Sequence, residues 1–120
     1  KLIEIGKEAV EKNYFSTHYH PEVGSAKSKQ FVENYKKRYS GKTPDALAAC
    51  GYDSALVLGD AIKRAGSTDG QKIRDALAAT KDIEAVTGKI TINEKRDAVK
   101  SAVILQVENG KYKFLETVSP

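Results

Sequence analysis

The longest apolar pattern of the chain lies between residues 46 and 62 and has helical spacing. Thr43 and Pro44 predict its start, because a hydroxyl caps a helix and proline suits the first helical position. Gly66 predicts its end. The apolar residues expected on one face are Leu47, Gly51, Ala55, Leu58 and Ile62. Tyr52 and Leu56 widen this stripe, which therefore indicates burial against more than one neighbour.

Three further segments have the pattern of helices. Residues 2–11 are typical of the end of a helix. Ser25 can cap an amphipathic helix that ends at Gly41 and places Phe31, Val32, Tyr35 and Tyr39 inward. Residues 67–69 precede a short helix with Ile73, Ala76 and Leu77 inward. The sequence thus predicts three or four helices.

Strand-forming residues occupy residues 13–18, 87–92 and 101–118. The last stretch predicts a hairpin, because Asn109-Gly110 suits a two-residue turn that needs positive φ at both positions. This turn would place three apolar pairs opposite one another: Val107 and Tyr112, Leu105 and Phe114, and Ile104 and Leu115.

Composition limits the chain to at most one domain of a globular protein. It has 120 residues, of which 40% are hydrophobic and 30% charged. No segment approaches the roughly 20 continuous apolar residues of a membrane span. The net charge is +4, and the densest basic run is Lys36-Lys37-Arg38. A basic run at a helix end favours a solvated surface over nucleic-acid binding.

Candidate chemistry is sparse. His18, His20 and Glu22 could hold a metal if they shared one face of a strand, but Pro21 ends the strand and no third histidine is available. Ordinary polar residues are the favoured interpretation. The chain has no Gly-x-Ser-x-Gly or Gly-x-Gly motif, so nothing favours an enzyme or a cofactor. Cys50, the single cysteine, is expected to be a buried, inert thiol.

Asp53 is unusual because it lies in the middle of the apolar helix. A buried carboxylate is costly unless it is paired or hydrogen-bonded. It could contact a ligand, bind a neighbouring loop, or cap a second helical segment after a kink at Gly51. The structural interpretations are favoured over the ligand contact.

Several short segments of the sequence together resemble the branched-chain-amino-acid-type solute-binding proteins of ABC importers. These segments are Gly51-Tyr52-Asp53-Ser54-Ala55, Asp60-Ala61-Ile62, Ile73-Arg74-Asp75-Ala76-Leu77 and Thr87-Gly88-Lys89-Ile90. The resemblance implies an α/β fold: a fragment of a doubly wound type I periplasmic-binding-protein lobe with a C-terminal β-hairpin. Residues 1–120 would be a single partial domain, and the missing initial Met agrees with a C-terminal segment of a longer protein. The match departs at residues 92–97, which lack the usual glycine, and at Lys12-Asn13.

The resemblance also implies a function. The intact protein would capture an amino acid or related metabolite for an ABC permease, in the periplasm or otherwise outside the cytoplasm. A ligand-sensing domain of the same fold that signals to a partner protein is the alternative. In this family the groups that hold the ligand lie mainly earlier in the sequence. This segment alone should therefore bind free amino acids weakly or not at all. Leu47 matches a position of the ligand pocket, although core packing explains it equally well.

A partial lobe would leave one side of the apolar helix and a sheet edge uncovered. We therefore expect the isolated chain to self-associate, as a dimer.

Overall fold

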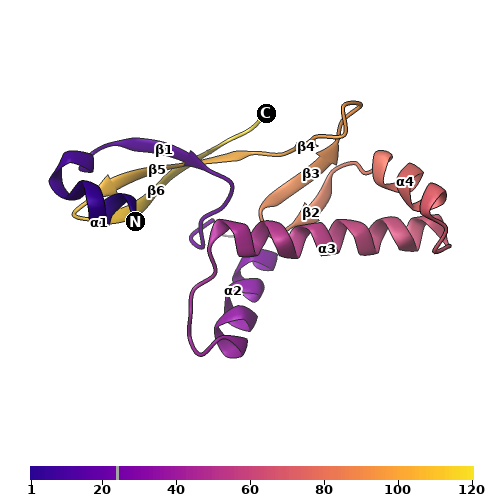
Figure 1. The fold of residues 1–120 in the computed structure, drawn as a ribbon, viewed down its shortest axis with the longest axis horizontal. Helices are drawn as coiled ribbons and strands as arrows, with labels where there is room; N and C mark the ends of the chain where they lie inside the picture. The colour runs from indigo at the N-terminus through magenta and orange to yellow at the C-terminus, as the bar shows by residue number, and fades with distance from the viewer. Residues whose placement is uncertain (24) are drawn as a thin grey trace.

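The computed structural model describes residues 1–23 and 25–120. In chain order the elements are α1 (Leu2–Gly6), the 3-10 helix η1 (Lys7–Val10), β1 (Tyr14–Thr17), α2 (Ala26–Arg38), α3 (Ala46–Ala65), α4 (Gly70–Ala78), β2 (Ile83–Ala85), β3 (Gly88–Ile92), β4 (Ala98–Val99), β5 (Ala102–Glu108) and β6 (Lys111–Val118) (Figure 1). The predicted strand at residues 13–18 and the C-terminal hairpin are both confirmed. The short strands β2 and β4 were not predicted from the sequence.

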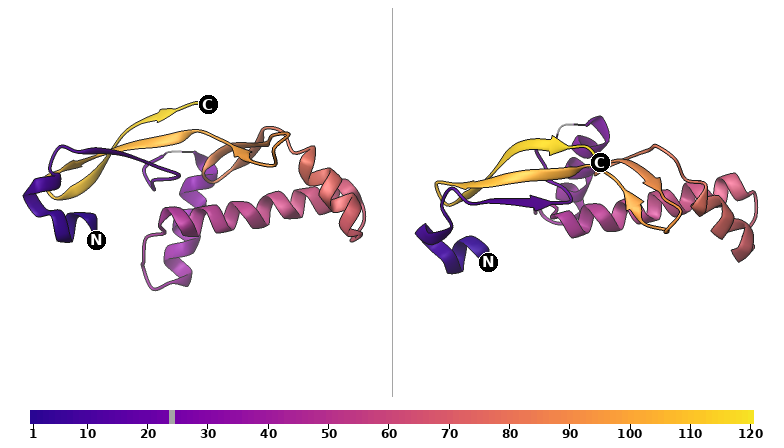
Figure 2. Two further views of the ribbon diagram at one scale, coloured as in Figure 1. Left: turned by 45° about the horizontal axis from the view of Figure 1, so that its top comes forward. Right: turned by 90° about the horizontal axis from the view of Figure 1, so that it is seen from above.

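The elements form two bodies that lie end to end (Figure 2). The sheet body contains α1, η1 and the antiparallel sheet β1-β5-β6. The helical body contains α2, α3, α4 and the antiparallel sheet β2-β3-β4. Among the described residues, every pair of elements in extensive contact belongs to one body. The bodies are thus joined mainly by the two chain segments that run between them, one from β1 to α2 and one from β4 to β5.

The shape is extended for a chain of this length. The radius of gyration is 16.7 Å, whereas a compact domain of this length has about 13.6 Å. The accessible surface is 8383 Å², roughly 2,000 Å² more than a folded monomer of this mass exposes. Much surface that a complete domain would bury is therefore open.

Side-chain caps fix where the helices begin. Ser25 Oγ accepts a hydrogen bond from the Ser28 amide at the start of α2, as predicted. The predicted start of α3 at Thr43 is wrong, because Asp45 Oδ1 takes the capping role by accepting from the Ala48 amide at 2.8 Å. A carboxylate two residues later thus displaces the hydroxyl. Gly66 ends α3 with φ 59°, as expected.

The buried face of α3 differs from the predicted one. It consists of residues spaced four apart: Ala49, Asp53, Val57 and Ala61. Three of the larger apolar residues are exposed, Leu47 by 78%, Leu58 by 44% and Ile62 by 37%. The reason is that the β2–β3 hairpin packs on the small residues, while no described element covers the wider apolar face.

Asp53 binds the tip of that hairpin. Residues 86 and 87 form the two-residue connection between β2 and β3. The Asp53 carboxylate, 2% exposed, accepts hydrogen bonds from the Val86 amide at 2.7 Å and the Thr87 amide at 2.8 Å. Val86 in turn packs with Tyr19, Phe31 and Ala49. The loop-binding interpretation of Asp53 is confirmed, and α3 continues unbroken through Gly51.

The C-terminal hairpin has the predicted register at its turn end only. Val107 faces Tyr112 and Leu105 faces Phe114, and Asn109 and Gly110 have φ values of 54° and 68°. Beyond this point a β-bulge between Ile104 and Leu105 shifts the pairing, so Ile104 faces Glu116 rather than Leu115. That predicted pair is wrong, because turn geometry fixes register only up to the first irregularity.

The two departures from the family pattern both coincide with strained backbone. Arg96 has φ 69° in the turn that lacks the usual glycine, and Lys12 has φ 63° just before β1. In the first turn, Asn93 Oδ1 accepts from the amides of Lys95 and Asp97, which holds the conformation without glycine.

Replacement of Asp53 tests whether its carboxylate fixes the hairpin tip. We expect Asp53→Ala to lower the free energy of unfolding by about 2–5 kcal/mol, because each buried amide left without an acceptor costs about 1–3 kcal/mol. Asp45→Ala is the matched control, since it removes one exposed cap from the same helix and should cost about 1 kcal/mol. If urea titrations gave the two variants equal losses in free energy of unfolding, the buried contact would stabilise the chain no more than the exposed cap does.

Candidate functional site

Leu47, the one ligand-contacting residue predicted from the sequence, lies in the first turn of α3. This end of α3 is the one nearer the sheet body (Figure 2). The side chain is almost fully exposed, so in the described residues it does not pack in a core. The structure brings no other predicted site residue to it.

The two segments between the bodies run close together. Lys100, just after β4, donates a hydrogen bond from Nζ to the carbonyl oxygen of His18, just after β1, at 2.9 Å. Burial lowers the pKa of Lys100, while its electrostatic interactions with Cys50 and with the Asp53 carboxylate on α3 act in the opposite direction. Sequence reasoning missed Lys100, because a single lysine between two short strands carries no pattern.

A hollow of about 300 Å³ adjoins Lys100. Its polar lining includes Cys50, Asp53, Ser54 and Thr87, and its apolar lining comes largely from β3. Cys50 is only partly buried, so the expected fully buried thiol is wrong. The reason is that Cys50 borders this hollow rather than the packed face of α3. The Thr87 hydroxyl is buried with no hydrogen-bond partner among the described residues.

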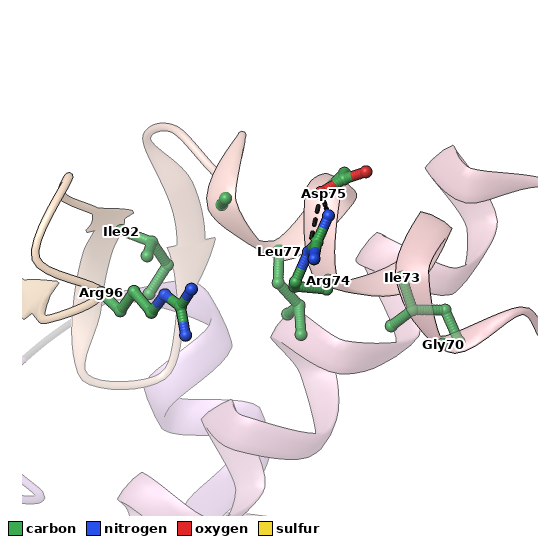
Figure 3. A pocket seen from close by; sticks show the side chains of 8 residues that line it. Gly70, Ile73, Arg74, Asp75, Leu77, Ile92 and Arg96 are labelled. Atoms are coloured by element: carbon green, nitrogen blue, oxygen red, sulfur yellow. Dashed lines mark hydrogen bonds and ion pairs between the residues drawn. The ribbon is translucent and has the colours of Figure 1, made fainter.

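A larger hollow of about 650 Å³ lies between α4 and β3, near the C-terminal end of α3 (Figure 1). Figure 3 shows the residues that line it. Ile73, Leu77 and Ile92 give it apolar walls. Arg74 in its rim is paired with Asp75 at 2.6 Å, and Arg96 extends toward it from the turn after β3. An apolar hollow with one paired carboxylate offers no acid–base set, and it does not include the predicted ligand contact.

The histidines near β1 do not form a metal cluster in the described part of the chain. His20 Nδ1 lies 3.9 Å from Glu22 Oε2, and the side chain of His18 is exposed. No three His, Cys, Asp or Glu side chains among the described residues come together in a way that could hold a metal ion.

Tyr19 fixes the first connecting segment to the helical body. It is 3% exposed, and its hydroxyl lies 2.9 Å from Ser28 Oγ on α2. Its ring packs edge-on against Phe31. Burial raises the pKa of the Tyr19 phenol, the Ser28 hydrogen bond lowers it, and the charge of Asp53 raises it further.

Comparison with known proteins identifies this arrangement. A family model described as periplasmic binding protein matches residues 1–111. The chain belongs to the periplasmic binding protein family. The resemblance to this family and the predicted fold, a fragment of a type I periplasmic-binding-protein lobe, are thereby confirmed.

Solved structures of this family extend the comparison. The leucine-binding protein LivK of Thermotoga maritima is 48% identical, with a TM-score of 0.86, over 99% of this chain and 34% of that chain. LivJ of Streptococcus pneumoniae, solved with isoleucine, is 36% identical, with a TM-score of 0.77, over 89% of this chain and 30% of that chain. A benzoate-bound solute-binding protein of R. palustris, at 20% identity and a TM-score of 0.79, shares the fold.

This periplasmic binding protein chain thus spans about a third of the length of these solved relatives. That fraction accounts for its large open surface, since two thirds of the relatives' structure has no counterpart here. Within the part of the chain that is described, no helix combines the length and the apolarity needed to cross a bilayer.

The raised pKa of Tyr19 predicts a loss of stability at alkaline pH. Because the unfolded phenol ionises near its ordinary pKa of 10.0 and the folded one only at a higher pH, stability is full below pH 10.0 and falls as pH rises through the folded value. The loss for this one group is at most about 1.4 kcal/mol per pH unit.

Denaturant titrations of the parent and Tyr19→Phe, at about pH 8 and about pH 11, measure this effect. The variant should lose less stability between the two conditions than the parent, whereas Tyr14→Phe, at an exposed tyrosine, should behave like the parent. An identical pH dependence for the parent and Tyr19→Phe would refute the assignment.

Proposed function

We propose that this chain is part of an extracytoplasmic solute-binding protein that captures a branched-chain amino acid for an ABC importer. The observation that carries the proposal is the 48% identity to a leucine-binding protein over nearly the whole chain. The similarity to an isoleucine-bound receptor at 36% identity supports the same ligand class. The benzoate-bound relative has lower identity, and so supports the fold rather than the ligand.

The remaining features of the proposal follow from that role. The protein is non-catalytic, its partners are the amino acid and an ABC permease, and it works in the periplasm or on the outer side of the membrane. Residues 1–120 are one partial domain of it. A sensory domain of the same architecture would share the fold, but the two most similar of these relatives are named for amino-acid binding or transport, which favours transport.

Calorimetric titration of the full-length protein tests the ligand class. L-leucine, L-isoleucine and L-valine should bind at micromolar or tighter concentrations, and benzoate should bind at least about tenfold more weakly. Preferential binding of benzoate, or of none of the four, would contradict the proposal.

We also propose that Leu47 contacts the side chain of the ligand. Its support is the exposed position at the end of α3 nearer the sheet body, since a two-lobed receptor holds its ligand between its lobes. In the full-length protein, Leu47→Ala should weaken L-leucine binding about tenfold or more, because a buried leucine side chain contributes about 1.5–3 kcal/mol.

The thermal midpoint distinguishes this role from core packing. Leu47→Ala should leave the midpoint close to that of the parent, and Leu115→Ala on β6 should leave affinity unchanged. A lower midpoint together with unchanged affinity would assign Leu47 to the core instead.

The 120-residue chain produced alone should dimerise. The support is the exposed apolar face of α3, which has no cover among the described residues. Light scattering at rising concentration should show the mass approaching that of a dimer. A compact monomer at every concentration would contradict this expectation.

A further inference from the structure

The two connecting segments between the bodies leave the sheet body at the end of the β1–β5 ladder. The β1–β5 ladder pairs Tyr14 to Thr17 with Gln106 to Val103 and ends there. Past that end, one segment turns into the helical body, where Tyr19 is buried, and the other comes from β4. Any rotation of one body against the other must therefore bend the chain around residues 18 and 100–101.

Lys100 adds one more link beyond the end of the ladder. Its Nζ donates to the carbonyl oxygen of His18, the residue directly after the last paired residue of β1. Among the described residues, no other hydrogen bond or ion pair joins the two connecting segments past the ladder, and none joins the sheet body to the helical body directly. A single side chain thus makes the cross-link at the point of bending.

The lysine side chain also lies beside the helical body. Its side chain borders the hollow lined by Cys50, Asp53 and Thr87, and it is half-buried. The Asp53 carboxylate is itself fixed by the Val86 and Thr87 amides, so the negative charge that faces Lys100 does not move freely. The ammonium group thus hydrogen-bonds to the carbonyl of one segment and is attracted toward a rigid part of α3, with which it forms no ion pair among the described residues.

We propose that Lys100 is a positioning residue of the hinge in the full-length binding protein, where it limits the angle between the two bodies by tying the connecting segments together. The inference rests on the proposed function, because a receptor of this kind closes on its ligand by bending at such segments. Without the tie, the unliganded protein samples a wider range of angles. Closure then costs more conformational entropy, and affinity falls.

The test uses three variants of the full-length protein with L-leucine as the probe. Lys100→Met keeps most of the side-chain stem and removes the ammonium group, and Lys100→Arg keeps a charged donor. Lys89→Met is the matched control, because it removes the ammonium of an exposed lysine whose ion pair with Glu84 lies within the helical body.

We expect Lys100→Met to weaken binding about tenfold, as the loss of a charge-assisted hydrogen bond allows. In small-angle scattering, its unliganded form should have a larger radius of gyration than the parent, and leucine should reduce that radius by more than in the parent. Lys100→Arg should restore both values, and Lys89→Met should match the parent.

Two results would overturn the inference. One is Lys100→Met with parental scattering and an affinity within about twofold of the parent. The other is a loss of affinity that follows a lower thermal midpoint with unchanged scattering, which indicates a purely structural lysine. If the parent itself binds no leucine, the proposed ligand fails, and the unliganded scattering of Lys100→Met against Lys89→Met still decides the hinge role.

Discussion

The helical body depends on one buried carboxylate. The β2–β3 hairpin meets α3 at its tip, and a tip buried away from water has amides that no solvent can satisfy. Asp53 accepts from both tip amides, which allows Val86 to enter the core beside Tyr19 and Phe31. The small residues Ala49 and Ala61 on the same face of α3 leave room for this approach. Without the carboxylate, only apolar contacts such as that of Val57 with Ala85 and Ile90 would hold the hairpin on the helix.

The same arrangement leaves a large apolar face of α3 uncovered. The hairpin covers the small-residue face of α3 and leaves the face with Leu47, Leu58 and Ile62 open. Together with the extended shape, this fits a chain that matches a third of its solved relatives. The sheet body and the helical body share only a narrow connection, as expected where two lobes of a binding protein meet at a hinge. The narrow connection between the two bodies is where we propose the hinge.

Local chemistry made several features predictable from the sequence. A cap such as Ser25, a C-terminal glycine such as Gly66 and the Asn109-Gly110 turn each act within a few residues, so their effect can be read locally. The cost of burying a charge predicted that Asp53 has a hydrogen-bonding partner, but it left open whether the partner is a loop or a second helical segment. Most of the register of the hairpin followed from its turn, up to the bulge near Leu105.

Other features depend on distant contacts. Periodicity correctly identified an apolar face on α3, but it could not tell which face meets a neighbour within this chain. Only the resemblance to the family points to Leu47, because nothing in its local sequence separates a pocket residue from a core residue. Lys100 acquires its importance from a carbonyl 82 positions away, and no local pattern encodes that contact. The strands β2 and β4 are too short to produce a periodic signal.

We propose that this chain supplies framework, hinge and one contact to the ligand's side chain, at Leu47, while the groups that hold the ligand's carboxylate and ammonium lie in the rest of the receptor. Calorimetric titration of the purified 120-residue chain with L-leucine is the decisive experiment. Circular dichroism establishes that the helices are formed, and the full-length protein is the positive control. We expect no measurable binding by the folded chain and clear binding by the full-length protein. Micromolar binding of leucine by the chain alone would contradict it.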